Sequence, residues 1–206
     1  MKDVLIKFYV NKFVFLKSED EADVSFLPPI LKRRLSKLDK CVLSVLKEAY
    51  TPDIQNIVFS SQYGEVERLI KLISQYQEGK EVSPNVFSGS VHNYPIGFFL
   101  LNEKNPIPYT AISSSEQSLS SGLLTSVISN FDNILYCYAD INNDNTAAMA
   151  LNISKNYNPQ GKLFQLKPDN KSDKTDYFDD YSDLFEGRTS FLDTSIFRLE
   201  RIINEK

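Results

Sequence analysis

Residues 133–139 have the sequence Asn-Ile-Leu-Tyr-Cys-Tyr-Ala, a continuous run without a charged side chain. A short apolar run of this kind indicates a strand that is buried on both faces. Further apolar or β-branched segments at 4–16, 56–60 and 107–112 precede it, separated by segments with helical spacing. This alternation predicts an α/β fold in which a mainly parallel, mixed sheet is flanked by helices and joined by right-handed crossovers.

Two of the segments between the strands are predicted to be amphipathic helices. Prolines 28 and 29 fit the first turn of one helix that ends near residue 49. Its predicted buried stripe follows spacings of three and four: Leu31, Leu35, Leu38, Val42, Val45 and Ala49. A second helix over 64–77 is predicted to turn its apolar side chains toward the core: Val66, Leu69, Ile70, Ile73 and Tyr76.

The composition excludes several kinds of chemistry. The 206 residues include 7 glycines, 2 cysteines and 1 histidine, and no glycine-rich phosphate loop or two-histidine metal motif can be written. We therefore expect no cofactor and no bound metal. The formal charge of −4 argues against nucleic-acid binding, and no apolar run is long enough to cross a membrane. The length fits one domain over 1–206. Because Cys41 and Cys137 show no disulfide pattern, we expect the protein to be located in the cytoplasm.

The C-terminal part of the chain differs in kind from the rest. Residues 146–154 are predicted to form a further strand, whereas residues 168–187 are dense in Asp and Lys and are predicted to be an exposed acidic loop. Lysines interrupt the aspartates, so calcium binding is not favoured. The spacing of Ile196, Leu199 and Ile203 predicts a short amphipathic helix that packs back on the core.

Three segments of this chain together resemble a known family. They are DVSFLPPILKRRLSKLDKCVLSVLKEA at 23–49, IVFSSQYGEVERLIKLI at 57–73 and SVHNYPIGFFLL at 90–101. The chain resembles the β-ketoacyl-synthase-like N-terminal domain, which is related to the first half of ketosynthases of the thiolase fold. The likeness covers about residues 20–150 and implies half of a thiolase-like fold. Residues 160–206 form a divergent C-terminal extension, and nothing else indicates whether they cover the faces that a second half would bury.

The departures from this family bear on activity. A ketosynthase carries its acyl chain on a cysteine where a strand turns into a helix, assisted by two histidines from its second half. The corresponding stretch here is 110–124, where Ser115, give or take one residue, takes the cysteine's place and no second half follows. The resemblance therefore implies no condensing activity for this chain alone. It implies a chain-length-factor-like partner of a full-length ketosynthase in type II fatty-acid or polyketide synthesis, such as an aryl-polyene or related pigment pathway.

The serine-rich turn allows a second interpretation. Ser115 as nucleophile, His92 as base and Glu116 nearby would make a serine-dependent acyltransferase or thioesterase. The favoured alternative is that Ser114 or Ser115 caps the following helix and that His92 is a structural hydrogen-bonding residue. A third hypothesis is a homodimeric module that binds acyl chains or an acyl carrier protein.

Two surfaces are candidates for partner binding. The stretch 94–101 has too many apolar residues for one helix face, and by the resemblance four of them line a dimer interface or the end of an acyl tunnel: Tyr94, Ile96, Phe98 and Phe99. The basic cluster Lys32, Arg33 and Arg34 is either an ordinary solvated helix face or a docking site for an acidic acyl carrier protein.

Overall fold

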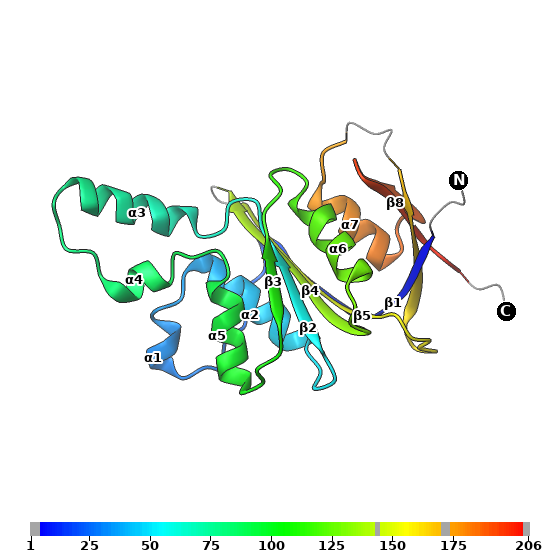
Figure 1. Ribbon diagram of the computed structural model, residues 1–206, viewed down its shortest axis with the longest axis horizontal. Coiled ribbons are helices and arrows are strands. Elements are labelled where there is room, and N and C mark those ends of the chain that lie inside the picture. Colours follow the sequence, from blue (N-terminus) through cyan, green and yellow to red (C-terminus); the bar gives the residue numbers. More distant parts are fainter. Residues whose placement is uncertain (1–4, 143–144, 170–173, 204–206) are drawn as a thin grey trace.

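The computed structural model describes residues 5–142, 145–169 and 174–203, which form one layered α/β structure (Figure 1). The strands are β1 (Ile6–Leu16), β2 (Asn56–Ser60), β3 (Tyr109–Ile112), β4 (Asn133–Asn142), β5 (Asn145–Ser154), β6 (Lys162–Pro168), β7 (Phe191–Asp193) and β8 (Phe197–Arg201). The helices are α1 (Pro29–Lys32), α2 (Lys37–Ala49), α3 (Val66–Gln77), α4 (Pro84–Ser88), α5 (Tyr94–Glu103), α6 (Ser118–Ile128) and α7 (Phe178–Glu186).

Among the described residues the strands form a single sheet in the order β3-β2-β4-β5-β1-β6-β8-β7. Strand β2 pairs in parallel with both β3 and β4, whereas β5 is antiparallel to β4 and to β1. Strands β1 to β4 therefore share one direction, as predicted. The expectation of mainly parallel pairing is wrong for the sheet as a whole, because the C-terminal strands add antiparallel pairs. Of these pairs, only β7 and β8 follow each other closely in sequence, as the strands of an antiparallel hairpin do.

Two hydrophobic cores lie on opposite faces of the sheet. Helices α2 and α5 cover one face, and fully buried Leu43 and Phe99 pack there against Ile57 and Cys137. Helices α6 and α7 cover the other face, where the buried side chains include Phe8, Tyr136, Leu123 and Phe185. Figure 1 shows this three-layer arrangement. As predicted, β4 is buried on both faces: Ile134 and Leu135 both have 0% exposure.

The predicted helix over 28–49 is divided in two. Helix α1 ends after one turn, and α2 begins after Ser36, whose hydroxyl accepts a hydrogen bond from the Asp39 backbone N–H at 2.9 Å. The Asp39 carboxylate in turn accepts from the Ser36 backbone N–H at 2.9 Å. This capping box satisfies two backbone donors at once and so favours a new helix start at this point. The apolar stripe survives the break, with Leu31 partly buried and the rest buried.

Helix α3 corrects a prediction about which side chains are buried. Its apolar face does not point into the core: Leu69, Ile70 and Ile73 are 46%, 58% and 48% exposed. Tyr76 is also exposed, and Leu72 is the buried α3 residue. Figure 1 shows α3 and α4 projecting together from the β3 side of the sheet. We call these two helices and their connection, residues 66–88, the arm.

The C-terminal segment is more ordered than its composition predicts. Helix α7 forms inside the predicted acidic loop 168–187 and buries Tyr181, Leu184 and Phe185 in the second core. Of that loop, residues 170–173 lie outside the described residues. Residues 197–201 form β8, which pairs with β6, and not the predicted helix. The extension therefore covers one sheet face and continues the sheet beyond β1. In the described part of the chain, no helix has the length and apolar character needed to cross a bilayer.

Candidate functional site

The carboxyl ends of the parallel strands β2, β3 and β4 bring the predicted site residues to one edge of the sheet. Ser61 follows β2, the serine turn 113–115 follows β3, and Asp140 lies near the end of β4. Ligands of open α/β sheets commonly bind at this edge, where loops leave adjacent strands in opposite directions. A nucleophile and its base would therefore be expected at the carboxyl ends of these strands.

A buried hydrogen-bond network holds the loop after β2. The Ser61 hydroxyl donates to an Asp140 carboxylate oxygen at 2.6 Å and accepts from the Gly64 backbone N–H at 2.7 Å. Asp140 also accepts from the backbone N–H groups of Gln62 and Tyr63 at 2.7 and 2.9 Å. The carboxylate thus serves as a structural acceptor for three donors. Sequence reasoning missed it, because Asp140 and this loop are almost eighty residues apart along the chain.

Ser115 lies in the strand-to-helix turn, as the resemblance implies. It has a positive φ of 51°, a conformation that costs energy for a side chain with a Cβ. Its hydroxyl makes no hydrogen bond with the described residues. The predicted cap is not formed by Ser114 or Ser115. Instead, the Ser118 hydroxyl accepts from the Ser114 backbone N–H at 2.9 Å and donates to the Ser115 carbonyl at 2.7 Å.

The contacts of His92 are those of a structural residue. Its Nε2 lies 3.3 Å from the Ser61 carbonyl oxygen, so the ring donates there, and it packs at 5.2 Å between ring centroids against Phe59. Gly64 makes room for this ring, since a Cβ at Gly64 would lie 2.9 Å from the histidine. No hydrogen bond joins His92 to Ser115 within the described residues. The structure thus brings the two candidate residues to the same edge of the sheet without forming a nucleophile–base pair.

Both thiols are unsuited to nucleophilic catalysis. Cys41 lies in α2 and Cys137 in β4, and both are buried and free. Burial raises the pKa of Cys41 to about 11, and it raises the pKa of Cys137 further still. Because the thiolate is the reactive form, these two residues stay protonated and inert near neutral pH.

The aromatic stretch 94–101 forms α5, and its residues divide between core and surface. Ile96 and Phe99 have 0% exposure and belong to the chain's own first core, so they offer no surface to a partner. Tyr94 and Phe98 are half-buried, with their ring centroids 5.9 Å apart. Leu101, near the end of α5, is the most exposed apolar residue of the stretch, at 80%.

An apolar hollow of about 620 Å³ lies between α5 and β3, the strand at one end of the strand order. It is lined by Gly97, Leu100, Leu101, Lys104, Asn105, Pro106, Ile107, Pro108 and Tyr109. The sequence instead predicts Phe98 and Phe99 for such a surface. The apolar loop Pro106–Pro108 was the available signal, but it looked like an ordinary turn.

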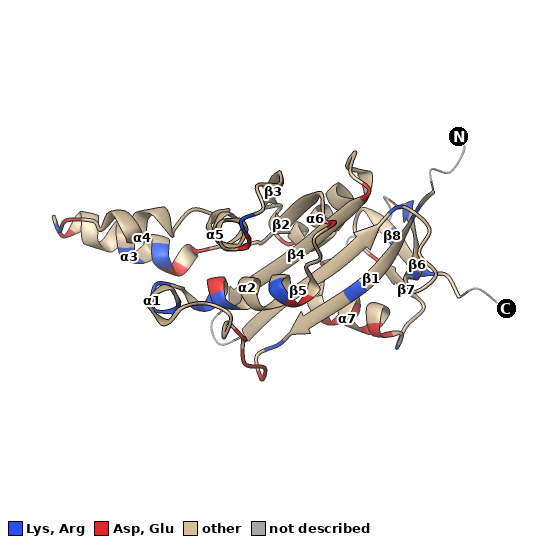
Figure 2. Cartoon of the chain, turned by 90° about the horizontal axis from the view of Figure 1, so that it is seen from below, with Lys and Arg blue, Asp and Glu red and all other residues tan. Residues whose placement is uncertain are grey.

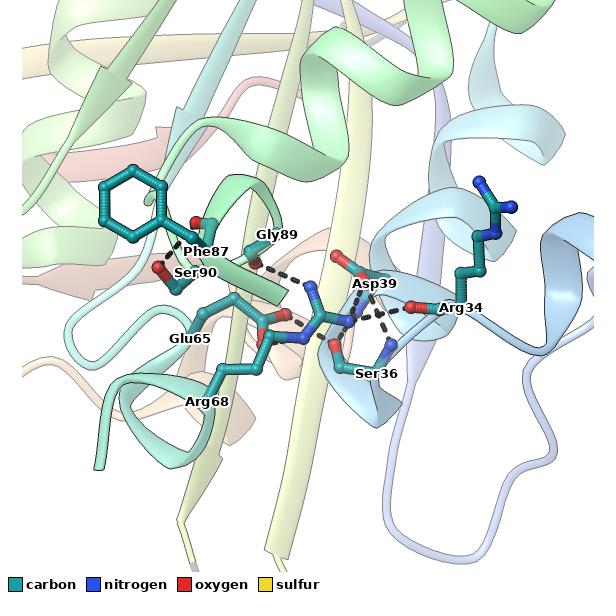
Figure 3. Close-up of polar contacts among 8 residues, drawn as sticks. All are labelled: Arg34, Ser36, Asp39, Glu65, Arg68, Phe87, Gly89 and Ser90. Atoms are coloured by element: carbon teal, nitrogen blue, oxygen red, sulfur yellow. Dashed lines mark hydrogen bonds and ion pairs between the residues drawn. The ribbon is translucent and has the colours of Figure 1, made fainter. Parts of the chain in front are cut away.

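A buried charged cluster joins the base of the arm to α2 (Figure 3). Arg68 of α3 forms an ion pair with Asp39 at 2.8 Å and another with Glu65 at 3.5 Å. The Ser36 hydroxyl donates to Glu65 at 2.5 Å. Burial, together with the nearby Asp39 charge, raises the pKa of Glu65 to about 7, and burial also raises the pKa of Asp39. One guanidinium thus faces two carboxyl groups, and Glu65 retains its proton to a higher pH than an exposed glutamate does.

The strand order, with β5 reversed between β4 and β1 and with helices after β1, β2 and β3, defines half of a thiolase-like α/β fold. The family model of the β-ketoacyl synthase N-terminal domain matches residues 10–176. The chain belongs to this family. The comparison with curated proteins gives no match.

Solved structures of related proteins share the fold. A ketosynthase (ApeO) in complex with its chain length factor (ApeC) from Xenorhabdus doucetiae matches with a TM-score of 0.71 and 18% identity, over 88% of this chain and 84% of that chain. The ishigamide ketosynthase/chain length factor matches with a TM-score of 0.52 and 13% identity, over 64% of this chain and 47% of that chain. A β-ketoacyl synthase from Burkholderia phymatum STM815 gives 0.55 and 12%, over 74% and 52%. The chain thus spans about half the length of the last two proteins.

Proposed function

We propose that this chain is a non-catalytic, chain-length-factor-like subunit that pairs with a full-length ketosynthase in type II fatty-acid or polyketide synthesis. The observation that carries the proposal is the edge strand β3, which lies beside the apolar hollow. The ketosynthase–chain length factor complexes among the structural relatives support it. The unpaired Ser115 and the inert thiols support the absence of condensing chemistry.

Strand β3 has the geometry to accept a partner strand. It pairs with β2 on one side and with no described strand on the other. The Ile57 and Ser61 backbone N–H groups donate to the carbonyls of Pro108 and Ile112, so these alternate residues face β2. Tyr109 and Ala111 therefore direct their backbone N–H and C=O groups outward. Unpaired edge groups of this kind favour strand addition by another polypeptide.

The mechanism would be steric. A ketosynthase packed along β3 would cover the apolar hollow, and the chain's Leu101, Tyr109 and half-buried Phe98 would help to shape the far end of the partner's acyl tunnel. A contiguous apolar surface at a sheet edge is typical of an interface between subunits. In this proposal, an aryl-polyene or related pigment pathway supplies the acyl chain, and the complex works in the cytoplasm.

The basic residues at the end of α1 and in the corner before α2 support a second partner. Figure 2 shows this basic region beside the arm. Lys32 reaches the Ser25 carbonyl at 3.4 Å, whereas the side chains of Arg33 and Arg34 are exposed and form no ion pair with described residues. As part of the proposal, an acidic acyl carrier protein approaches the complex from this side by electrostatic steering.

Co-expression with full-length ketosynthases, beginning with any encoded at the same locus, tests the pairing. We expect the two proteins to co-purify as a heterodimer by native mass spectrometry. Ala111→Pro removes an outward N–H without removing a β2–β3 hydrogen bond, so it should abolish co-purification, whereas Ala111→Ser, which retains the N–H, should not. A chain that is stable alone and ignores every such ketosynthase contradicts the proposal, and a homodimer supports the acyl-binding module instead.

A serine-dependent acyltransferase or thioesterase remains the second candidate, because Ser115 has an unbonded hydroxyl in a turn with positive φ. Strained strand-to-helix turns do present catalytic serines in some hydrolases. Assays with acyl thioesters and p-nitrophenyl esters decide between the two. Turnover that Ser115→Ala and His92→Ala abolish would establish the enzyme, and we expect none.

A further inference from the structure

A second pocket, of about 300 Å³, lies between the α1–α2 corner, the base of the arm and the start of α5. Its lining residues are Arg33, Arg34, Arg68, Asn85, Val86, Ser88 and Tyr94. Three of these seven residues carry a guanidinium, and none carries a carboxylate. A pocket lined in this way favours an anionic ligand.

The positive charge of Arg68 is already balanced by carboxylates, whereas the charges of Arg33 and Arg34 are not. Asp39 and Glu65 pair with Arg68, are 0% and 6% exposed, and do not line the pocket. The guanidiniums of Arg33 and Arg34 form no ion pair with any described residue. Figure 3 shows the Arg34 guanidinium pointing away from the carboxylates. The pocket thus carries about two uncompensated positive charges, which matches a dianion.

Arg68 is held in place before any ligand binds. Its Nη1 donates to the Gly89 carbonyl at 2.6 Å, and its Nη2 donates to the Arg34 carbonyl at 3.1 Å and to Asp39 at 2.8 Å (Figure 3). Because each Nη carries two N–H groups, one N–H of Nη1 has no acceptor among the described residues. A Cβ at Gly89 would collide with this guanidinium, so the glycine permits the close approach.

The remaining walls fit a phosphate ester better than a carboxylate. The Asn85 amide and the Tyr94 hydroxyl make no hydrogen bond with described residues and add neutral donors to the guanidiniums. Several donors suit the three terminal oxygens of a phosphate monoester, whereas a carboxylate has two. The volume also exceeds that of a phosphate group, and Val86 and the Tyr94 ring offer apolar contact to an organic part.

We propose that this pocket binds the phosphate monoester of a small organic molecule, with Arg33, Arg34 and Arg68 on the phosphate and with Val86 and Tyr94 beside the organic group. The site does not depend on the pairing with a ketosynthase. It also differs in position from the apolar hollow, which lies at the other end of α5 and along β3.

Calorimetric titration of the full chain with phenyl phosphate, inorganic phosphate and benzoate tests this site. We expect phenyl phosphate to bind tightest and benzoate weakest. Arg33→Gln and Arg34→Gln should each weaken phenyl phosphate about tenfold, the effect of losing one charge-assisted hydrogen bond. Lys37→Gln, an exposed cation outside the pocket, is the matched control and should change the affinity little.

Amide chemical shifts in a labelled sample give an independent readout, and we expect the largest changes with phenyl phosphate at Asn85, Val86 and Tyr94. Equal affinity for benzoate would overturn the phosphate assignment. An equal effect of Lys37→Gln, shift changes elsewhere, or no binding to a folded chain would overturn the site itself. The Arg33 and Arg34 side chains make no hydrogen bond with described residues, so their variants should fold as the parent does, which thermal unfolding checks.

Discussion

The guanidinium of Arg68 lies 2.8 Å from the carboxylate of Asp39, and this ion pair fastens the projecting α3 to the packed helix α2. Arg68 is 14% exposed in its side chain and Asp39 is fully buried, so the pair is shielded from salt and solvent. Glu65 completes the cluster one turn before Arg68. The base of the arm is thus held by buried charges, while most of its apolar face meets solvent.

The first prediction concerns the pH dependence of stability. The folded-state pKa of Glu65 is about 7, against an ordinary value of 4.5. As the pH rises from 4.5 to 7, the unfolded chain therefore loses a proton that the folded chain retains, and the free energy of unfolding falls. The loss is on the order of 3 kcal/mol, from about 1.4 kcal/mol per pKa unit. Glu65→Gln has no such proton and should flatten this decline.

Urea unfolding at about pH 5 and about pH 8 measures this effect. Glu67→Gln, which changes an exposed glutamate in the first turn of α3, is the control and should keep the parent's slope. A parent chain whose stability rises between these two pH values, relative to Glu65→Gln, contradicts the assignment.

The exposed apolar face of α3 leads to a second prediction. Because Ile70 is 58% exposed, Ile70→Ser should change the free energy of unfolding of the isolated chain by less than about 0.5 kcal/mol. Leu72 is buried on the same helix, so Leu72→Ala should cost about 2 kcal/mol or more. Thermal or urea unfolding of the two variants compares them directly. A large cost for Ile70→Ser would show that this face is covered within the chain.

A close approach between α6 and the sheet gives the third prediction. Tyr136 donates to the Leu119 carbonyl at 2.7 Å and lies 2.8 Å from the Ser60 hydroxyl, all beneath Gly122. A Cβ on Gly122 would lie 2.6 Å from the Tyr136 ring. Gly122→Ala should therefore destabilise the fold by about 1–3 kcal/mol through overpacking.

The matched control for this variant is Gly97→Ala in α5. A Cβ there would meet the Tyr109 hydroxyl at 3.7 Å, an ordinary contact. Since alanine favours helix over glycine, this variant should gain up to about 1 kcal/mol. Melting temperatures of the two variants should move in opposite directions, and a shared direction would contradict the packing argument.

The thiols give the fourth prediction. Cys41 and Cys137 are buried, and burial holds the pKa of each above its usual range. A disulfide reagent such as dithionitrobenzoate should therefore modify neither residue rapidly in the native chain, and both after addition of denaturant. Rapid reaction of one thiol in the native state would reopen the question of a cysteine nucleophile.

Local sequence patterns determined much of the fold. The apolar run at 133–139 predicts a strand buried on both faces, and β4 is buried in that way, because such a run has no polar side to offer water. The segments 23–49, 57–73 and 90–101 together indicate the ketosynthase family, and the family model confirms it. The strand-to-helix turn at Ser115 was likewise predictable, since the serines separate an apolar strand from a helical pattern.

Other features were decided by contacts between distant residues. Periodicity shows which α3 side chains share a face, but only the tertiary structure shows that nothing in the described chain covers Ile70 and Ile73. Residues 196–203 fit helical spacing, yet hydrogen bonding to β6 makes residues 197–201 a strand. Asp39, Glu65 and Arg68 look like solvated helix charges in the sequence, and folding brings them together in a buried cluster. Spacing along the chain sets a residue's local face, whereas burial, pairing and pKa depend on neighbours that only the fold supplies.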